Sequence, residues 1–207
     1  PGAKWHGFSG YARDQYFVDP CKLLLTTPGI DAQTGQYTEF GIPATILAHY
    51  LRESSVIPEK ADLNSILFLL TPAETLAKFQ HLVARIVSFE KHIRENSPVT
   101  QVLPTLAKAY PQYRKLTINE LCQLMHNFYA KHQLNKRQKQ MFEREHRPKV
   151  AISAFDAHNA FIRNEVELVS LHDIKGRIAM EGALPYPPGV YCIVPGEVWD
   201  GAVLDYF

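Results

Sequence analysis

Several motifs that would assign a chemistry directly are missing from this chain of 207 residues. The sequence contains no Walker A loop, no GxSxG nucleophile elbow and no HExxH zinc motif, so P-loop, serine-hydrolase and zincin functions find no support. Its nine histidines are scattered along the chain. His126 and His132 lie six positions apart with no third ligand type at a suitable spacing, and we therefore predict no metal site.

Cysteine is also sparse, and neither sign of charge dominates. The three cysteines, Cys21, Cys122 and Cys192, are far apart in the sequence. Their odd number argues against a disulfide framework, so we expect buried or half-buried free thiols in a reducing cytoplasm. The net charge is +1, which provides no global field that would attract nucleic acid or an anionic membrane. We expect neither as a partner.

Long apolar runs are missing as well, since none approaches the ~20 residues that a membrane span requires. The start of the chain, PGAKWHGFSGYARDQ, is polar, lacks the apolar region of a signal peptide and begins with proline rather than methionine. We therefore expect a cytoplasmic protein of which this chain is an internal piece.

The first half alternates short apolar runs with helical patterns. The runs at residues 22–27 and 63–70 predict buried strands, and the segment 55–60 predicts a short extended piece. PATILAHYLRE predicts an amphipathic helix that opens at Pro43. The capping-box pattern of residues 71–74 predicts a long helix that continues through Ile93. The order strand, helix, strand, strand, helix indicates an α/β (α+β) fold.

The second half is less regular. A change of composition at residues 94–101 predicts a domain boundary, and a second capping box, TINE at 117–120, predicts another helix. Residues 131–149 are highly charged with both signs, which is typical of a solvated helix face. Alternating or apolar patterns predict strands at 165–171 and 190–194. The face of the helix after TINE is predicted from Leu121, Leu124, Met125, Phe128 and Tyr129.

Three features could contribute to a functional site. Glu59 precedes the apolar run 63–70, and a carboxylate near a strand end can bind a cation, although a solvated edge carboxylate is the alternative. Tyr186 lies between two prolines, which preset its backbone and aim its side chain; simple packing is the alternative. The aromatic cluster WHGF at 5–8 could pack at a loop or line a site.

Several stretches together resemble one family. WHGF, DPCKLLLTTPGI, FGIPATILAHYL, PEKADLNSILFLL and LPYPPGVYCIVPGE are similar to segments of the large bacterial pyridoxal-phosphate-dependent ornithine/lysine/arginine decarboxylases, in the same order along the whole chain. AFDAHNAFIRNEVELVSL and the residues around Tyr191 and Cys192 resemble the ornithine branch. The resemblance implies that residues 1–95 form the small domain of a fold-type I decarboxylase and residues 96–207 a truncated, mixed α/β C-terminal domain.

The resemblance also implies a function for the parent protein. It would decarboxylate L-ornithine to putrescine and CO2 with pyridoxal 5'-phosphate, in polyamine biosynthesis or an acid response, as a dimer or higher oligomer. No lysine here follows a Ser-x-His motif, so the cofactor lysine is expected upstream and the fragment is expected to be inactive.

Two residues acquire roles through the same resemblance. Glu59 would bind the distal ammonium of the small-molecule amino-acid substrate, and Tyr186 would lie near the active-site entrance. The WHGF cluster would be scaffolding close to the cleft. Lysine or arginine decarboxylase is the alternative within the family, and a non-catalytic regulatory or binding homologue is the alternative outside enzymes.

Overall fold

The computed structural model describes residues 19–31, 33–186 and 189–207. The WHGF cluster at 5–8 lies outside these ranges. The chain divides into two compact units between Lys131 and His132.

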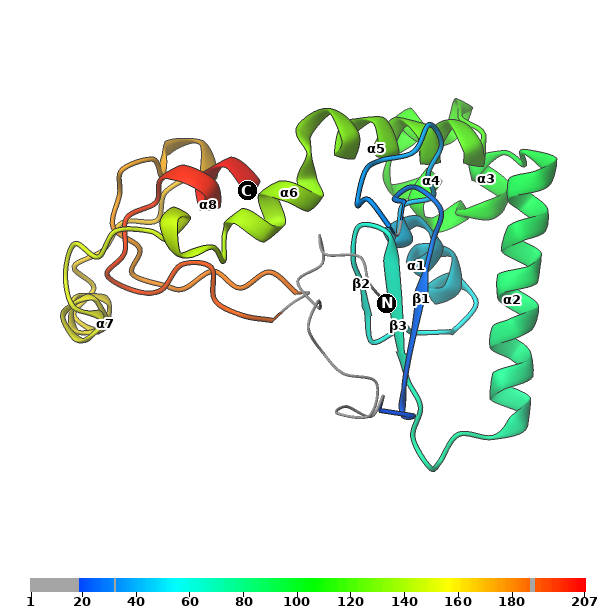
Figure 1. The fold of residues 1–207 in the computed structure, drawn as a ribbon, viewed down its shortest axis with the longest axis horizontal. Helices are drawn as coiled ribbons and strands as arrows, with labels where there is room; N and C mark the ends of the chain where they lie inside the picture. The colour runs from blue at the N-terminus through cyan, green and yellow to red at the C-terminus, as the bar shows by residue number, and fades with distance from the viewer. Residues whose placement is uncertain (1–18, 32, 187–188) are drawn as a thin grey trace. The chain divides into compact units, whose positions relative to one another are not determined.

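The first unit contains a three-stranded antiparallel sheet in the order β1-β3-β2 (Figure 1). Its strands are β1 (Lys22–Thr26), β2 (Lys60–Ala61) and β3 (Ser65–Leu69). The apolar run 63–70 supplies the central strand, whose residues Ile66 and Phe68 are buried. The strand predicted at 22–27 is confirmed, but its predicted burial is wrong. β1 lies at an edge of the sheet, and Leu24 is 58% exposed because only alternate side chains face the core.

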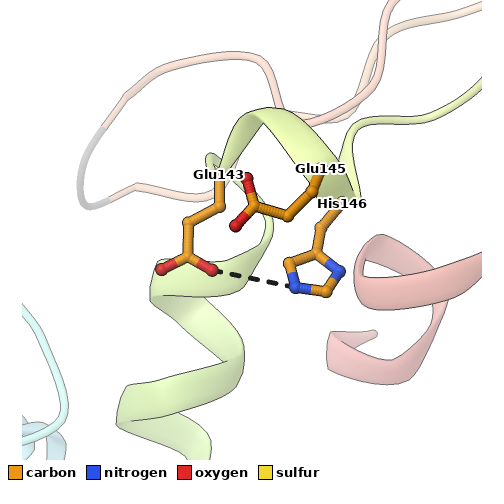
Figure 2. Close-up of side chains that lie close together, drawn as sticks. All are labelled: Glu143, Glu145 and His146. Atoms are coloured by element: carbon orange, nitrogen blue, oxygen red, sulfur yellow. Dashed lines mark ion pairs between the residues drawn. The ribbon is translucent and has the colours of Figure 1, made fainter.

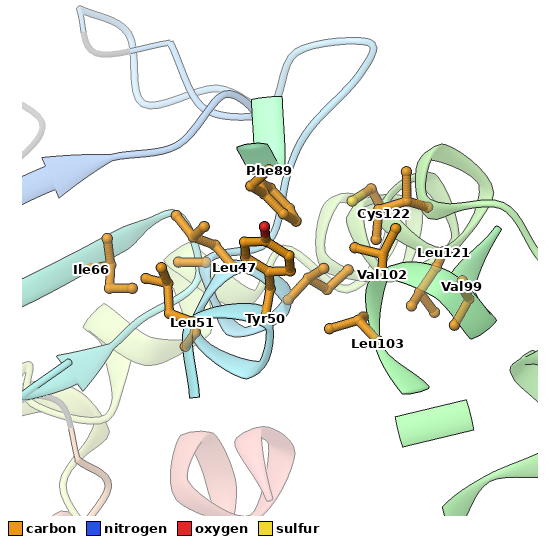
Figure 3. Packing of buried hydrophobic residues seen from close by; sticks show 14 of the residues in the cluster. Leu47, Tyr50, Leu51, Ile66, Phe89, Val99, Val102, Leu103, Leu121 and Cys122 are labelled. Carbon is orange, nitrogen blue, oxygen red and sulfur yellow. The ribbon is translucent and has the colours of Figure 1, made fainter. Parts of the chain in front are cut away.

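Helix α1 (Ala44–Glu53) covers the sheet and forms the centre of the main core. It contacts β2, β3 and α2, and Leu47, Tyr50 and Leu51 point into the cluster that Figure 3 shows. Pro43 is the residue before the helix rather than its first helical residue. The predicted amphipathic helix is confirmed.

Helix α2 (Leu76–Glu95) begins four residues later than its predicted start at Pro72. Thr71 and Glu74 do meet, since the Thr71 hydroxyl donates to a Glu74 carboxylate oxygen at 3.5 Å. They form a turn that precedes the helix, and Thr75 is the actual cap, with its hydroxyl accepting from the Lys78 N–H. The predicted extent through Ile93 is confirmed.

Short helices follow α2 and pack on the same core. They are α3 (Val99–Val102), α4 (Pro104–Ala109), the 3-10 helix η1 (Pro111–Lys115) and α5 (Ile118–His132). Val99, Leu103 and Leu121 belong to the buried cluster that also contains Leu51 and Ile66. The compact units divide between Lys131 and His132, because the helices after residue 96 bury apolar residues in the same cluster as α1 and the sheet. The domain boundary predicted from composition at 94–101 stays a prediction.

The capping box at the start of α5 is confirmed. The Glu120 N–H donates to the Thr117 hydroxyl at 3.3 Å, and the Thr117 N–H donates to the Glu120 carboxylate at 2.8 Å. The predicted helix face is only partly correct. Leu121 is buried, whereas Leu124 and Phe128 are 56% and 55% exposed. The inward face includes Cys122 and His126 instead.

The second unit, His132–Phe207, has short helices linked by long irregular segments. They are α6 (Leu134–Gln140), η2 (Arg144–His146), α7 (Ala154–Ile162), η3 (Leu171–Asp173) and α8 (Gly201–Tyr206). A small core joins Met141, Ala179, Cys192, Ile193 and Val203. No residue of α6 is buried, which fits the solvated helix predicted within 131–149.

Both strands predicted in the second unit are wrong. Residues 165–170 have no regular secondary structure, and the Glu167 carboxylate pairs with Arg177 at 2.7 Å instead of facing a neighbouring strand. Residues 190–194 contribute one isolated bridge, Ala183↔Ile193. Pro185 and Pro195 limit this pairing because proline has no N–H to donate to a ladder.

Among the described residues, every helix is too short or too polar to cross a membrane.

Candidate functional site

Glu59 lies at the start of the β2–β3 hairpin in the first unit. Its N–H donates to the Leu67 carbonyl at 2.9 Å, and the following residue, Lys60, is paired with Leu67 in the sheet. The side chain of Glu59 is exposed, whereas the preceding Pro58 is buried. The hairpin therefore fixes the backbone of Glu59 at a position where the residue is exposed.

The turn of this hairpin is held by a buried amide. Asn64 is 8% exposed, and its Nδ2 donates to the carbonyl oxygens of Pro28 at 2.9 Å and Ile42 at 3.3 Å. His126 lies beside it, with Nε2 2.7 Å from the Thr38 carbonyl oxygen. Sequence reasoning did not identify either residue as part of this arrangement, since their partners are backbone atoms of distant loops.

Tyr186 lies in a loop of the second unit. The Ala183 N–H donates to the Ile193 carbonyl at 3.1 Å, and the Gly189 N–H donates to the Pro185 carbonyl at 2.8 Å. Gly189 has φ +78°, and a β-carbon there would lie 3.0 Å from the Tyr186 ring. The ring therefore lies beside Gly189 and remains 58% exposed. Whether Tyr186 contributes to a site stays a prediction.

The structure places Glu59 and Tyr186 in different compact units. Neither residue lines either of two cavities in the described part of the chain. One cavity of about 270 Å³ lies in the first unit, where Ile57, Leu69 and Lys78 contribute to its wall. The other, of about 1190 Å³, lies in the second unit and includes Leu168 and Trp199.

Neither of these two cavities fits the attachment of pyridoxal phosphate. A Schiff-base lysine must reach into a cavity, and the only lysine lining either cavity in the described part of the chain is Lys78. Its ammonium is already paired with Glu74 at 3.0 Å, and its side chain is largely exposed.

One cluster of metal-ligand types was not predicted. Glu143, Glu145 and His146 lie on and beside η2, with their ligand atoms within 4.8 Å of one another (Figure 2). The His146 Nε2 and a Glu143 oxygen are 3.8 Å apart. The sequence E-x-E-H was the available signal, but it lies within a charged stretch. Glu145 and His146 are exposed, and such acidic groups commonly gather without an ion.

The cysteines are free, as predicted, but they differ in environment. Cys122 is completely buried in α5, and burial raises the pKa of its thiol to about 12. Burial also raises the pKa of Cys192, whose Sγ donates to the Ala183 carbonyl. Cys21 is exposed, which differs from the prediction that all three would be at least half-buried. The two buried thiols are unsuited to nucleophilic chemistry at neutral pH.

Comparison with known proteins identifies the family. Residues 1–78 match the major domain of the Orn/Lys/Arg decarboxylases, and residues 135–207 match their C-terminal domain. The chain is 62% identical to the constitutive ornithine decarboxylase of Escherichia coli K12 over 208 aligned residues, which cover 100% of this chain and 29% of the relative. It is 51% identical to the inducible ornithine decarboxylase of Lactobacillus sp. strain 30a, covering 100% of this chain and 28% of that protein.

A solved structure supports the same assignment. Lysine decarboxylase A from Pseudomonas aeruginosa superposes with a TM-score of 0.86 at 37% identity, covering 100% of this chain and 28% of that one. The chain thus spans less than a third of the length of the relatives it matches. It belongs to the Orn/Lys/Arg decarboxylase family and corresponds to a C-terminal portion of its members.

Proposed function

We propose that the longer protein containing this chain converts L-ornithine to putrescine and CO2. The observation that supports this most directly is the difference in identity between branches of the family. Identity is 62% with an ornithine decarboxylase of Escherichia coli, but 37% with a lysine decarboxylase and 31% with an arginine decarboxylase. The alignments with the first ornithine decarboxylase and with this lysine decarboxylase both cover 100% of this chain. The difference between 62% and 37% identity therefore reflects sequence and not aligned length.

Glu59 is proposed to bind the distal ammonium of the substrate. The residue is exposed, and its backbone is fixed by the bond from its N–H to the Leu67 carbonyl. A carboxylate and an ammonium form a charge-assisted hydrogen bond, which is roughly twice as strong as a neutral one. This interaction would favour a diamino acid over one whose side chain has no charge.

Tyr186 is proposed to lie near the entrance to the active site of the longer protein. Its ring is exposed and is held beside Gly189 by a closed turn. A ring presented in this way can limit access to a cleft without contacting the reacting atoms. The role proposed for Tyr186 is therefore one of access and not of chemistry.

Pyridoxal 5'-phosphate is the proposed cofactor of the longer protein. When bound, this cofactor supplies an electron sink at the α-carbon of the amino acid. Lys78, the one lysine lining either cavity described above, is paired with Glu74, and we assign the attachment of the cofactor to the part of the protein outside this chain. This chain is proposed to contribute one wall of the site and the contact to the distal amine.

The family assignment also suggests how the chain divides into domains. We propose that residues 1–95 belong to the small domain and residues 96–207 to the C-terminal domain, with helices α3 to α5 packed on the small domain. We further propose that the longer protein is cytoplasmic, forms dimers or larger assemblies, and serves polyamine biosynthesis or an acid response.

An assay of the purified full-length protein with ornithine, lysine and arginine tests the proposed function. We expect the highest kcat/KM with ornithine, measured by release of CO2. A higher value with lysine or arginine would assign the protein to another branch. No release from any of the three would favour a non-catalytic homologue.

A further inference from the structure

The position of Glu59 depends on the register of the β2–β3 hairpin. The turn between the strands is closed by the Asp62 N–H, which donates to the Ser65 carbonyl at 2.7 Å. Lys60 then pairs with Leu67 and Ala61 with Ile66. A slip of one residue in this pairing would turn every side chain of β2 to the opposite face. Whatever fixes the turn therefore also fixes the direction of the Glu59 carboxylate.

Asn64 connects this turn to two other parts of the first unit. Its amide donates to Pro28, in the loop after β1, and to Ile42, just before α1. The same two residues are bonded to each other, with the Ile42 N–H donating to the Pro28 carbonyl at 2.7 Å. The Asn64 carbonyl also accepts from the Thr27 N–H at 2.9 Å. The Asn64 side chain thus connects the hairpin turn to Pro28 and Ile42, two residues that are themselves joined by a backbone hydrogen bond.

The surroundings of the Asn64 amide permit little adjustment. Gly29 has φ +136°, and a β-carbon there would lie 2.5 Å from Asn64 Nδ2 and 3.2 Å from His126 Nδ1. His126 is completely buried and is held by its bond to the Thr38 carbonyl. The amide is therefore enclosed on one side by the Gly29 backbone and by the buried His126 ring.

Stability alone does not account for an asparagine at this position. Its Oδ1 is buried and has no hydrogen-bond partner among the described residues. A buried acceptor without a partner is unfavourable. Both carbonyls to which the amide donates also have a second donor, the Ile42 N–H for Pro28 and the Thr27 hydroxyl for Ile42. What the amide supplies, and an apolar side chain does not, is two directed donors toward Pro28 and Ile42.

We propose that Asn64 is a positioning residue for Glu59. Its amide fixes the turn of the β2–β3 hairpin, and through the hairpin it fixes where the Glu59 carboxylate meets the distal ammonium of the substrate. Asn64 itself contacts no substrate. This inference rests on the substrate-binding role proposed for Glu59.

A double-mutant cycle in the full-length holoenzyme tests the proposal. The variants are Asn64→Ala, Glu59→Gln and the combination, with kcat and KM measured for ornithine. We expect Asn64→Ala to raise KM about tenfold and to change kcat less than about twofold, because a misplaced contact weakens substrate binding first. In the Glu59→Gln background the same substitution should change KM less than about twofold, since coupled residues are not additive.

Two further variants separate positioning from packing. Asn64→Ser is the conservative variant and should raise KM less than Asn64→Ala does, because its hydroxyl can still donate a hydrogen bond. It also allows the cycle to be run if Asn64→Ala does not fold. Asn119→Ala is the matched control. Its Nδ2 donates to the Ile93 carbonyl at 2.9 Å and its Oδ1 is likewise buried without a partner, but it lies outside the hairpin. It should leave KM for ornithine unchanged.

Two results would overturn the inference in different ways. If Asn64→Ala changed KM by the same factor in the unsubstituted protein and in the Glu59→Gln background, Asn64 would have a purely structural role. The role of Glu59 would then stand. Unchanged kcat/KM in Glu59→Gln alone would remove the role of Glu59 and this inference together.

Discussion

Gly41 and His126 are in such close contact that a side chain at position 41 has no room. A β-carbon built on Gly41 would lie 2.6 Å from Cε1 and 2.7 Å from Cγ of the imidazole. The ring cannot move away easily, because it is fully buried and its Nε2 is bonded to the Thr38 carbonyl. The glycine is thus required by packing, and its backbone does not have a positive φ.

We therefore expect Gly41→Ala to lower the free energy of unfolding by about 1–3 kcal/mol, the usual cost of overpacking a core. Thermal unfolding of the chain measures this directly. Gly176→Ala is the comparison, since a β-carbon there meets nothing within 4 Å and only its φ of +76° is unfavourable. Its expected cost is about 1 kcal/mol. Equal destabilisation by both substitutions would contradict the packing argument for Gly41.

Replacement of Glu59 by glutamine should reduce the use of ornithine in the full-length enzyme. The loss of a charge-assisted hydrogen bond to the distal ammonium is expected to lower kcat/KM by about 1.5–3 kcal/mol in free energy. Glu90→Gln removes the same charge from an exposed position on α2, where the side chain lies 3.7 Å from Arg94. This control should leave kcat/KM unchanged, and an equal loss in both variants would indicate a general effect of charge.

Glu120 should make stability depend on pH at the start of α5. Hydrogen bonds from the Thr117 N–H, and then from its hydroxyl, lower the pKa of the Glu120 carboxyl. A carboxyl whose pKa is lower in the folded state stabilises the fold above its unfolded value of about 4.3, and this contribution is lost as the pH falls through the folded value. Glu120→Gln should therefore lower Tm at pH 7.

The difference in Tm between Glu120→Gln and the unsubstituted chain should become smaller below about pH 4, where the glutamate is progressively protonated. Thermal unfolding monitored by circular dichroism across this range measures it. Glu90→Gln, outside any capping box, should show little difference at either pH. A constant difference from pH 7 to acid would show that the charge of Glu120 does not contribute to the cap.

Features determined by neighbours in the sequence were predictable. Thr117 and Glu120 are three residues apart, and the capping box that they form was visible in the pattern. The central strand β3 and the helices α1 and α2 likewise follow from local hydrophobic periodicity. The start of α2 was predicted less accurately, because Thr71 and Thr75 can both cap a helix. Only the structure shows that Thr75 is the cap of α2.

Features that depend on distant partners were not predictable. Residues 165–171 alternate like a strand, but a strand needs a neighbour, and Glu167 pairs with Arg177 instead. The same limit applies to the candidate site. The partners of Asn64 and His126 are backbone carbonyls of other loops, which no residue type reveals. The substrate-binding role of Glu59 came from the family resemblance, whereas the exposure of the residue and its paired backbone are properties of the fold.

The isolated chain should neither decarboxylate ornithine nor bind pyridoxal phosphate at a specific site. Of the lysines, only Lys78 lines either of the two cavities described above, and its ammonium is paired with Glu74. Incubation with the cofactor, borohydride reduction and peptide mapping should yield at most scattered, substoichiometric labelling of surface lysines. The full-length protein is the positive control and should be labelled once per chain. Stoichiometric labelling of one lysine in the isolated chain, together with release of CO2 from ornithine, would show that the cofactor site lies within these residues.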